Sequence, residues 1–247
     1  PNVLRMTWAD QWIDTLEPQT NDDGISDLVL LNYEPLTRLD EELNVVPGAA
    51  ESWQFSPDGL TLTFHLREGL TYSDGSPLTA ERFRYAIARM CDPHLGFSDA
   101  LGYFDVAGCE ALYTSLQGTD DTPVPSAAAY ERALANLGVT ALDDRTLEIR
   151  LTRPAPYFPS LAGWIGFAPV KQELIEAGGP EWWRDPANWV GNGPFQLSAI
   201  QPDADPPSLL MTRNTRYWAG PAKLDGLDLV MIPGEERLAA YQRGELD

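Results

Sequence analysis

The side chains that could perform catalysis or bind a metal are few in this sequence. Cys91 and Cys109 are its only cysteines, and His65 and His94 are its only histidines. None of the four forms the Cys-x-x-Cys or His-x-x-x-His spacing that zinc sites use. The sequence also lacks a glycine-rich phosphate loop, a dinucleotide fingerprint and a Gly-x-Ser-x-Gly nucleophile elbow. These patterns predict neither a metal site nor a bound cofactor.

Carboxylates and tryptophans, in contrast, are abundant. The chain has 37 Asp and Glu residues and eight Trp residues. Glycosidases use two carboxylates that flank the scissile bond, and aromatic platforms can support such a site. No single pair stands out among so many acids. A carbohydrate-active enzyme or an oligosaccharide-binding protein therefore stays open as one hypothesis.

The charge of the chain argues against nucleic acid as a partner. Its 17 Lys and Arg residues against 37 acids give a net charge of −20. Phosphate backbones attract clustered Lys and Arg, and the sequence has no such cluster. The longest apolar runs are far shorter than the roughly 18 residues that a membrane-spanning helix requires. A hydrophobic fraction of 43% is typical of a globular chain with one or two cores.

The clearest local pattern predicts a β-hairpin over residues 51–70. Apolar and polar residues alternate on both sides of a turn, 56–59, that has the Pro and Gly placement of a type I turn. His65 falls on the polar face of the second strand, which indicates a surface histidine. A second turn at 73–77 precedes Thr79, whose side chain we expect to cap a helix that runs to about Met90.

The rest of the chain mixes helical and strand patterns. Helices are predicted at 27–36, 127–137 and 171–177, and strands at 146–151, 195–200, 208–213 and 227–231. An acidic, proline-rich surface loop is expected at 120–126. Two glycines flank Asn192, and we expect them to allow backbone angles that other residues avoid, in a tight, hinge-like crossing. The fold class predicted by these elements is α/β.

Seven motifs, taken together and in order, resemble one known family. They lie at residues 32–36 (NYEPL), 46–53 (VPGAAESW), 62–69 (LTFHLREG), 72–80 (YSDGSPLTA), 92–93 (DP), 191–195 (GNGPF) and 213–218 (RNTRYW). The chain resembles the extracellular solute-binding proteins of peptide-type ABC importers, the oligopeptide/dipeptide-binding family 5. Asn192 stands where the family more usually has Thr, and the two cysteines are not a general family feature.

The resemblance implies a periplasmic-binding-protein-like fold of type II, of which this chain would be an N-terminal fragment with the first lobe only. Residues 1–48 and 166–247 would form the discontinuous α/β lobe, and residues 49–165 would form an inserted α+β subdomain. The second lobe would be missing from the chain. Closure of two lobes around a ligand would then shift an existing open and closed equilibrium.

The family also implies a function without catalysis. The full protein would capture a peptide or similar small solute and deliver it to an ABC permease, as an extracytoplasmic monomer held to a membrane only through a lipid anchor upstream of Pro1. Di- or oligopeptides, oligosaccharides, nickel chelates and haem all stay open as solutes. The candidate ligand contacts are Asn32, Tyr33, Glu34, Phe97, Tyr103 and Trp164. Glu34 is placed to meet a ligand cation, whereas ordinary packing is the alternative for the aromatic residues.

The two cysteines flank a segment rich in turn-forming residues. We expect this segment to leave the preceding helix and to run over the surface with little core of its own. A covalent link would then stabilise it by limiting the unfolded ensemble, and an extracytoplasmic location would let the bond persist. The prediction is a Cys91–Cys109 disulfide, with two buried free thiols as the alternative.

Overall fold

The computed structural model describes residues 2–10, 15–19, 26–95, 100–116 and 127–247. The predicted contact Phe97 and the predicted loop at 120–126 lie outside these ranges. The strands are β1 (Val3–Ala9), β2 (Thr37–Leu39), β3 (Val45–Pro47), β4 (Ala50–Phe55), β5 (Thr61–Leu66), β6 (Val139–Ala141), β7 (Thr146–Arg150), β8 (Phe195–Gln201), β9 (Ser208–Arg213) and β10 (Gly226–Met231).

Helices separate these strands along the chain. The α-helices are α1 (Ser26–Asn32), α2 (Ala80–Met90), α3 (Cys109–Tyr113), α4 (Ala127–Ala135), α5 (Phe158–Leu161), α6 (Gln172–Gly178) and α7 (Gly234–Gln242). Short 3-10 helices are η1 (Ala100–Tyr103), η2 (Ile165–Phe167), η3 (Gly179–Arg184) and η4 (Pro186–Asn188). None of the helices in the described ranges is both long and apolar enough to cross a membrane.

One antiparallel sheet has the strand order β4-β5-β7-β6. It contains the predicted hairpin, in which Trp53 pairs with Phe64 and Phe55 with Leu62. The residues of β5 alternate between partly and fully buried, so the period-two pattern does produce one core-facing side. His65 lies on the less buried side, as expected.

Helix α2 contacts β6 and β7 of this sheet. It begins directly after Thr79, but the Thr79 side chain makes no capping hydrogen bond, so the predicted cap interaction is wrong. The Arg82 N–H, which such a cap would satisfy, donates to the Thr79 backbone carbonyl oxygen at 3.0 Å, and the Ala80 N–H donates to the Asp144 carbonyl oxygen at 2.8 Å. A carbonyl from the loop before β7 thus satisfies a donor that helix starts leave unpaired.

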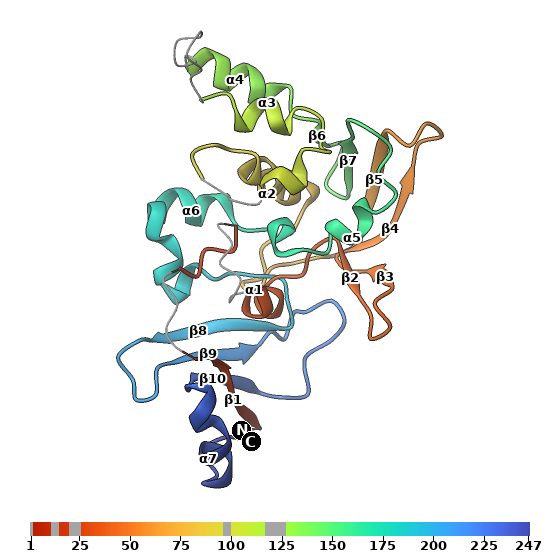
Figure 1. The fold of residues 1–247 in the computed structure, drawn as a ribbon. Coiled ribbons are helices and arrows are strands. Elements are labelled where there is room, and N and C mark those ends of the chain that lie inside the picture. Colours follow the sequence, from red (N-terminus) through yellow and green to blue (C-terminus); the bar gives the residue numbers. More distant parts are fainter. Residues whose placement is uncertain (1, 11–14, 20–25, 96–99, 117–126) are drawn as a thin grey trace.

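A second sheet joins the two ends of the chain in the order β1-β10-β9-β8. Strands β8, β9 and β10 match the predicted strands and pair antiparallel. Strand β1, which the sequence patterns did not predict, pairs parallel with β10, with Val3 opposite Gly226. The N- and C-termini therefore lie side by side next to α7 (Figure 1).

The buried side chains form two main clusters. The hairpin core surrounds β4–β7 and α2, and most of its members come from residues 36–167. The terminal core packs β8–β10 against α1 and Trp182, Trp183 and Trp189, with members from residues 16–33 and 165–231. The strands that contribute to them, β4–β7 and β8–β10, lie in the upper and lower parts of Figure 1. The domain boundaries implied by the resemblance stay a prediction.

The disulfide between Cys91 and Cys109 is present, with Cα atoms 5.1 Å apart. It links the C-terminal end of α2 to the first residue of α3. The expectation of a surface excursion between them is wrong for its described part, since Ala100, Tyr103 and Val106 are buried in the hairpin core. The bridge therefore lies inside a packed region.

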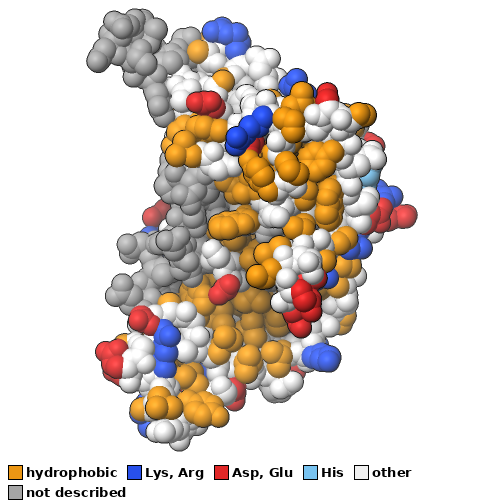
Figure 2. All heavy atoms as spheres, turned by 45° about the vertical axis from the view of Figure 1, so that its right-hand side comes forward, with side chains coloured by type: hydrophobic (Ala, Val, Ile, Leu, Met, Phe, Trp, Pro, Cys, Tyr) orange, Lys and Arg blue, Asp and Glu red, His pale blue; other side chains and the backbone are white. Residues whose placement is uncertain are grey.

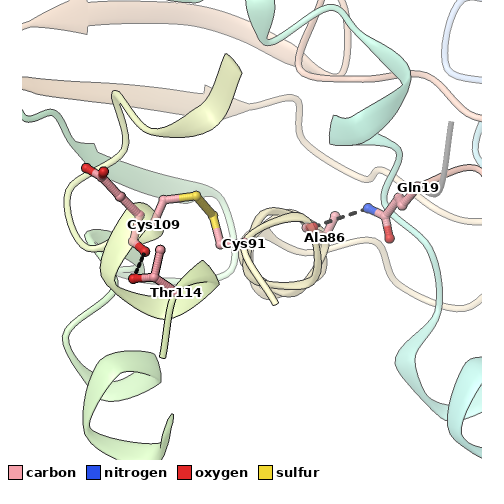
Figure 3. Close-up of a disulfide and its surroundings, with 6 residues drawn as sticks. Gln19, Ala86, Cys91, Cys109 and Thr114 are labelled. Carbon is pink, nitrogen blue, oxygen red and sulfur yellow. Dashed lines mark hydrogen bonds between the residues drawn. A yellow bond between two sulfur atoms is a disulfide. The ribbon is translucent and has the colours of Figure 1, made fainter. Parts of the chain in front are cut away.

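Helix α2 is held on two opposite sides. Figure 3 shows it end on, with the disulfide on one side and Gln19 on the other. The Gln19 amide nitrogen donates to the carbonyl oxygens of Ala86, at 3.2 Å, and Gly166, at 3.0 Å. Because Gly166 lies in η2, Gln19 ties α2 to the segment that leads into the terminal core.

Candidate functional site

A cavity of about 540 Å³ brings two of the predicted contacts together. Its described lining consists of Ser26, Leu30, Glu34, Pro35, Arg38, Leu39, Ser160, Gly163, Trp164, Ile165, Pro194 and Tyr217. We call it the Glu34–Trp164 pocket. Its size falls in the range of small-ligand sites, which are mostly apolar with a few polar groups.

Exposed apolar side chains surround this pocket. Trp164 is 58% exposed, Leu39 51% and Leu30 39%. Hydrophobic side chains gather over much of the face that includes the right-hand side of Figure 1 (Figure 2). Apolar surface of this kind favours contact with another molecule or with another part of the protein.

The segment that carries Glu34 follows directly from α1. The helix ends at Asn32, before Pro35, in agreement with the prediction, because proline disfavours helical geometry in the preceding residue. The Glu34 backbone N–H donates to Asn192 Oδ1 at 3.0 Å, and Asn192 Nδ2 donates to the Glu34 carbonyl oxygen at 2.9 Å. This reciprocal pair fixes the Glu34 peptide group against the 191–193 loop.

The glycines beside Asn192 allow the 191–193 loop to lie close to the end of α1. The predicted reason, backbone angles that other residues avoid, is wrong. Neither Gly191 nor Gly193 has a positive φ. A Cβ atom at Gly193 would lie 2.6 Å from the Leu31 carbonyl oxygen, and one at Gly191 would overlap the Asn32 carbonyl group. The Gly193 N–H donates to that Asn32 carbonyl oxygen at 2.9 Å. The loop therefore needs glycine because it lies directly on the end of α1.

The Glu34 side chain is an incompletely satisfied buried acid. It is 5% exposed, and its Oε1 has no hydrogen-bond partner among the described residues. Burial raises the pKa of Glu34, against opposing effects of the Tyr217 and Trp218 polar groups and of the charges of Arg38 and Arg67. Buried polar atoms are normally paired, so an unpaired carboxylate oxygen requires an explanation.

The two residues before Glu34, Asn32 and Tyr33, face the terminal core. Both are fully buried. Asn32 Oδ1 accepts a hydrogen bond from the Leu197 N–H at 2.8 Å, which joins α1 to β8. The Tyr33 ring packs 6.1 Å from the Trp189 ring, and burial raises its pKa. Both show packing roles here, and their contact with a ligand stays a prediction.

Tyr103 lies apart from the pocket. It is 4% exposed, and its ring centroid is 5.6 Å from that of Phe167 in the hairpin core. The structure thus brings Glu34 and Trp164 together, whereas Tyr103 does not line this pocket. Sequence reasoning missed Arg38 and Tyr217 as lining residues. Tyr217 belongs to the RNTRYW motif, which was the available signal, whereas Arg38 had none.

A second cavity, of about 650 Å³, lies beside α2 and η3, but its buried charges are paired. Arg89 Nη1 and Nη2 donate to the two Glu17 oxygens at 2.9 and 3.1 Å. Trp182 also donates to Glu17. These contacts stabilise the packing of α2 against η3. Across the described ranges, no group of three or more His, Cys, Asp or Glu side chains could hold a metal ion.

The fold and the pocket are typical of a protein that binds small solutes. A family model described as "Bacterial extracellular solute-binding proteins, family 5 Middle" matches residues 44–247. The chain therefore belongs to this family, and the resemblance seen in its motifs is confirmed.

Known relatives agree with this assignment. The chain is 37% identical to the dipeptide-binding protein DppE of Bacillus subtilis over 87% of its own length and 36% of that protein. It is 36% identical to the probable deoxycholate-binding periplasmic protein YgiS of Escherichia coli, over 74% of this chain and 32% of that one.

The solved structure of the Escherichia coli murein tripeptide-binding protein MppA resembles it with a TM-score of 0.82 and 27% identity, covering 99% of this chain and 45% of that one. The predicted α/β, periplasmic-binding-protein-like fold is therefore confirmed. The chain spans less than half the length of each of these relatives.

Proposed function

We propose that this chain forms one wall of an extracytoplasmic solute-binding protein that captures a peptide or a similar small solute for an ABC importer. The observation that carries this proposal is the Glu34–Trp164 pocket, where an exposed indole lies beside a buried acid. Relatives named for binding a dipeptide and a murein tripeptide support a peptide, and the relative named for deoxycholate keeps other solutes open.

The physical mechanism is enclosure between two lobes. Main-chain hydrogen bonds hold an extended peptide whatever its side chains, and hydrated pockets accept varied side chains. We assign residues 1–48 and 166–247 to one lobe and residues 49–165 to an inserted subdomain. The two buried clusters, which divide close to these boundaries, support the assignment.

The function we propose has no catalytic step. The relatives named above are called binding proteins, which supports transport over hydrolysis. Neither the matched family nor these relatives carry a name that supports the carbohydrate alternative. A monomeric state and a lipid anchor stay predictions.

The test uses the full-length protein that contains this chain. Native mass spectrometry of the purified protein identifies any ligand that co-purifies, and calorimetry then gives its affinity. We expect Trp164→Ala to weaken binding by about tenfold, since loss of a buried aromatic contact costs on the order of 1–2 kcal/mol. Leu142→Ala, an exposed apolar side chain outside the pocket lining, is the control. Release of reducing ends from oligosaccharides would overturn the proposal.

A further inference from the structure

The buried carboxylate of Glu34 defines a chemical preference for the pocket. We propose that the Glu34–Trp164 pocket is a subsite for a positively charged organic group of the solute, an alkylammonium or a guanidinium, with Glu34 as its counter-charge. This inference rests on the proposed function, because the group is taken to belong to the captured solute. Four features of the pocket bear on it: three support it, and one, the arrangement of nearby cations, includes a charge that opposes a bound cation.

The first feature is the position of the acid. Glu34 lines the pocket although only 5% of the residue is exposed, and its Oε1 has no partner among the described residues. Leaving an oxygen of a buried carboxylate unpaired is unfavourable. A cation in the pocket would offset this cost. The low dielectric of the surroundings strengthens their attraction even without direct contact.

The second feature is the apolar wall. Leu30, Leu39 and Trp164 all line the pocket and are all exposed. A Lys or Arg side chain carries its charge on an apolar stem that can lie along such a wall. The Trp164 ring can also attract a cation over its face. An anionic group would be repelled by the Glu34 carboxylate and would gain no attraction over the Trp164 ring.

The third feature is the arrangement of nearby cations. Arg67 stacks on the Trp218 ring, with its Cζ atom 3.6 Å from the ring centroid, and donates from Nε to the Gly48 carbonyl oxygen at 2.8 Å. Arg38 is exposed and lies 5.6 Å from the same ring centroid. Both charges act on Glu34, yet Oε1 stays unpaired. Of the two, Arg38 alone lines the pocket, so it is the charge that opposes a bound cation.

The fourth feature is the fixed backbone of the acid. Asn192 holds the Glu34 peptide group on both sides with hydrogen bonds of 3.0 and 2.9 Å. The backbone from which the Glu34 side chain extends therefore cannot move without breaking this pair. A rigid counter-charge discriminates better than a mobile one, because less ordering is required when the ligand binds.

The experiment compares matched ligands on the full-length protein. Calorimetry measures the affinity for alanine tripeptides that carry lysine at the first, second or third position. It also measures the affinity for matched peptides in which neutral norleucine replaces the lysine. n-Butylammonium and 1-butanol provide a second pair without a peptide backbone, followed through tryptophan fluorescence. We expect the cationic member to bind about tenfold more tightly in at least one peptide pair, equivalent to about 1.4 kcal/mol.

Three variants locate the preference. Glu34→Gln should remove the preference for lysine over norleucine and leave the affinity for the norleucine peptides within about twofold of the wild-type value. Arg38→Ala should increase the preference. Glu68→Gln makes the same chemical change at an exposed acid outside the pocket and should change nothing. Circular dichroism verifies that each variant is folded.

The outcomes separate this inference from the proposed function. If peptides bind and Glu34→Gln leaves the lysine preference unchanged, the subsite is overturned and the proposed function stands. If no peptide binds but n-butylammonium binds in a manner that depends on Glu34, the subsite stands and a peptide solute is excluded. If neither probe binds, both proposals fail.

Discussion

The hairpin core and the terminal core differ in how far apart along the chain their parts lie. In the hairpin core, β4 pairs with the next strand, β5, and most members come from one continuous stretch. In the terminal core, residues near position 4 pack with residues near position 229. Contacts between neighbouring segments form early in folding, and contacts between distant segments form late. Pairing between neighbouring strands also leaves a clearer pattern in the sequence. The hairpin core also has a covalent link, and the terminal core has none among its described members.

The largest effect is expected at the contact between the 191–193 loop and α1. Gly191→Ala would place a Cβ atom in the Asn32 carbonyl group, so the chain must shift there. We expect a loss of about 3–4 kcal/mol of stability. Hydrogen exchange should show loss of protection in β8–β10 with the hairpin core less affected.

A control glycine without neighbours tests this interpretation. Among the described residues outside its own helical turn, a Cβ atom at Gly102 would meet no atom within 4 Å. Gly102→Ala should therefore change stability by less than about 0.5 kcal/mol. Equal losses in both variants would show that the close approach is not the cause.

The second effect concerns the covalent link of the hairpin core. Replacing both Cys91 and Cys109 with Ala should lower stability by about 3 kcal/mol, since the bridge closes a loop with a sequence separation of 18. The protection lost in hydrogen exchange should fall in α2, α3 and β6, and not in β8–β10. A loss centred on the terminal core would contradict the division into two regions.

The third effect is a pH-dependent gain in folding stability when the buried acid Glu34 is replaced. The pKa of Glu34 is raised in the folded state, so the folded protein favours the protonated form and loses stability as pH rises above 4.5. Glu34→Gln should therefore stabilise the unliganded protein by about 1 kcal/mol at neutral pH. The gain should disappear below pH 4.5, where the acid is protonated in both states. Thermal melts across pH measure it, and a gain of equal size at all pH values would contradict the mechanism.

The smallest effect is at an ion pair that joins the two regions. Lys171 Nζ lies 2.7 Å from Asp74 Oδ2 and donates to Ser76 at 3.0 Å. Burial alone would raise the pKa of Asp74, but hydrogen bonds from Lys171 and Ser76 lower it to about 2. Asp74→Asn should cost about 0.5 kcal/mol, because the Asp74 side chain is 40% exposed.

The pH dependence of this pair runs opposite to that of Glu34. Its contribution is complete above the ordinary pKa of 3.8 and disappears as pH falls through about 2. Denaturant melts of Asp74→Asn and the wild type should therefore converge in acid. A difference that persists below pH 2 would mean that the charge of Asp74 is not responsible.

The same contrast explains which parts of the fold could be predicted. Alternation over β5 and the apolar stripe of α2 are local, and both elements were found with nearly correct ends. Strand β1 has exposed and half-buried residues without a clean alternation and no fully buried one, and its partner lies more than 200 residues away. The Thr79 side-chain cap failed because the Arg82 N–H, which it would satisfy, donates to the Thr79 backbone carbonyl oxygen at 3.0 Å.

The site divides in the same way. Motif residues located the loop with Glu34, and Trp164 was named only as one of several candidate aromatic contacts. Tertiary packing decides which of these residues face the pocket. Tyr33 adjoins Glu34 in sequence, yet it turns into the terminal core. Arg38 carried no sequence signal because its role depends on lying next to Trp218, which is 180 positions later. Spacing alone does not contain that information.

The pairing of the two chain ends has a consequence for synthesis. Besides the β1–β10 ladder, the Asp247 N–H donates to the Arg5 carbonyl oxygen at 2.9 Å, and the Arg5 N–H donates to Asp247 Oδ2 at 2.7 Å. A ribosome delivers residue 3 long before residue 226, so the first strand emerges without its neighbour and stays without it while the residues between them are synthesised. The hairpin core can form in that interval, whereas the sheet that contains both ends completes only when the last residues of this segment emerge. The β1–β10 ladder itself closes only once synthesis has passed residue 231.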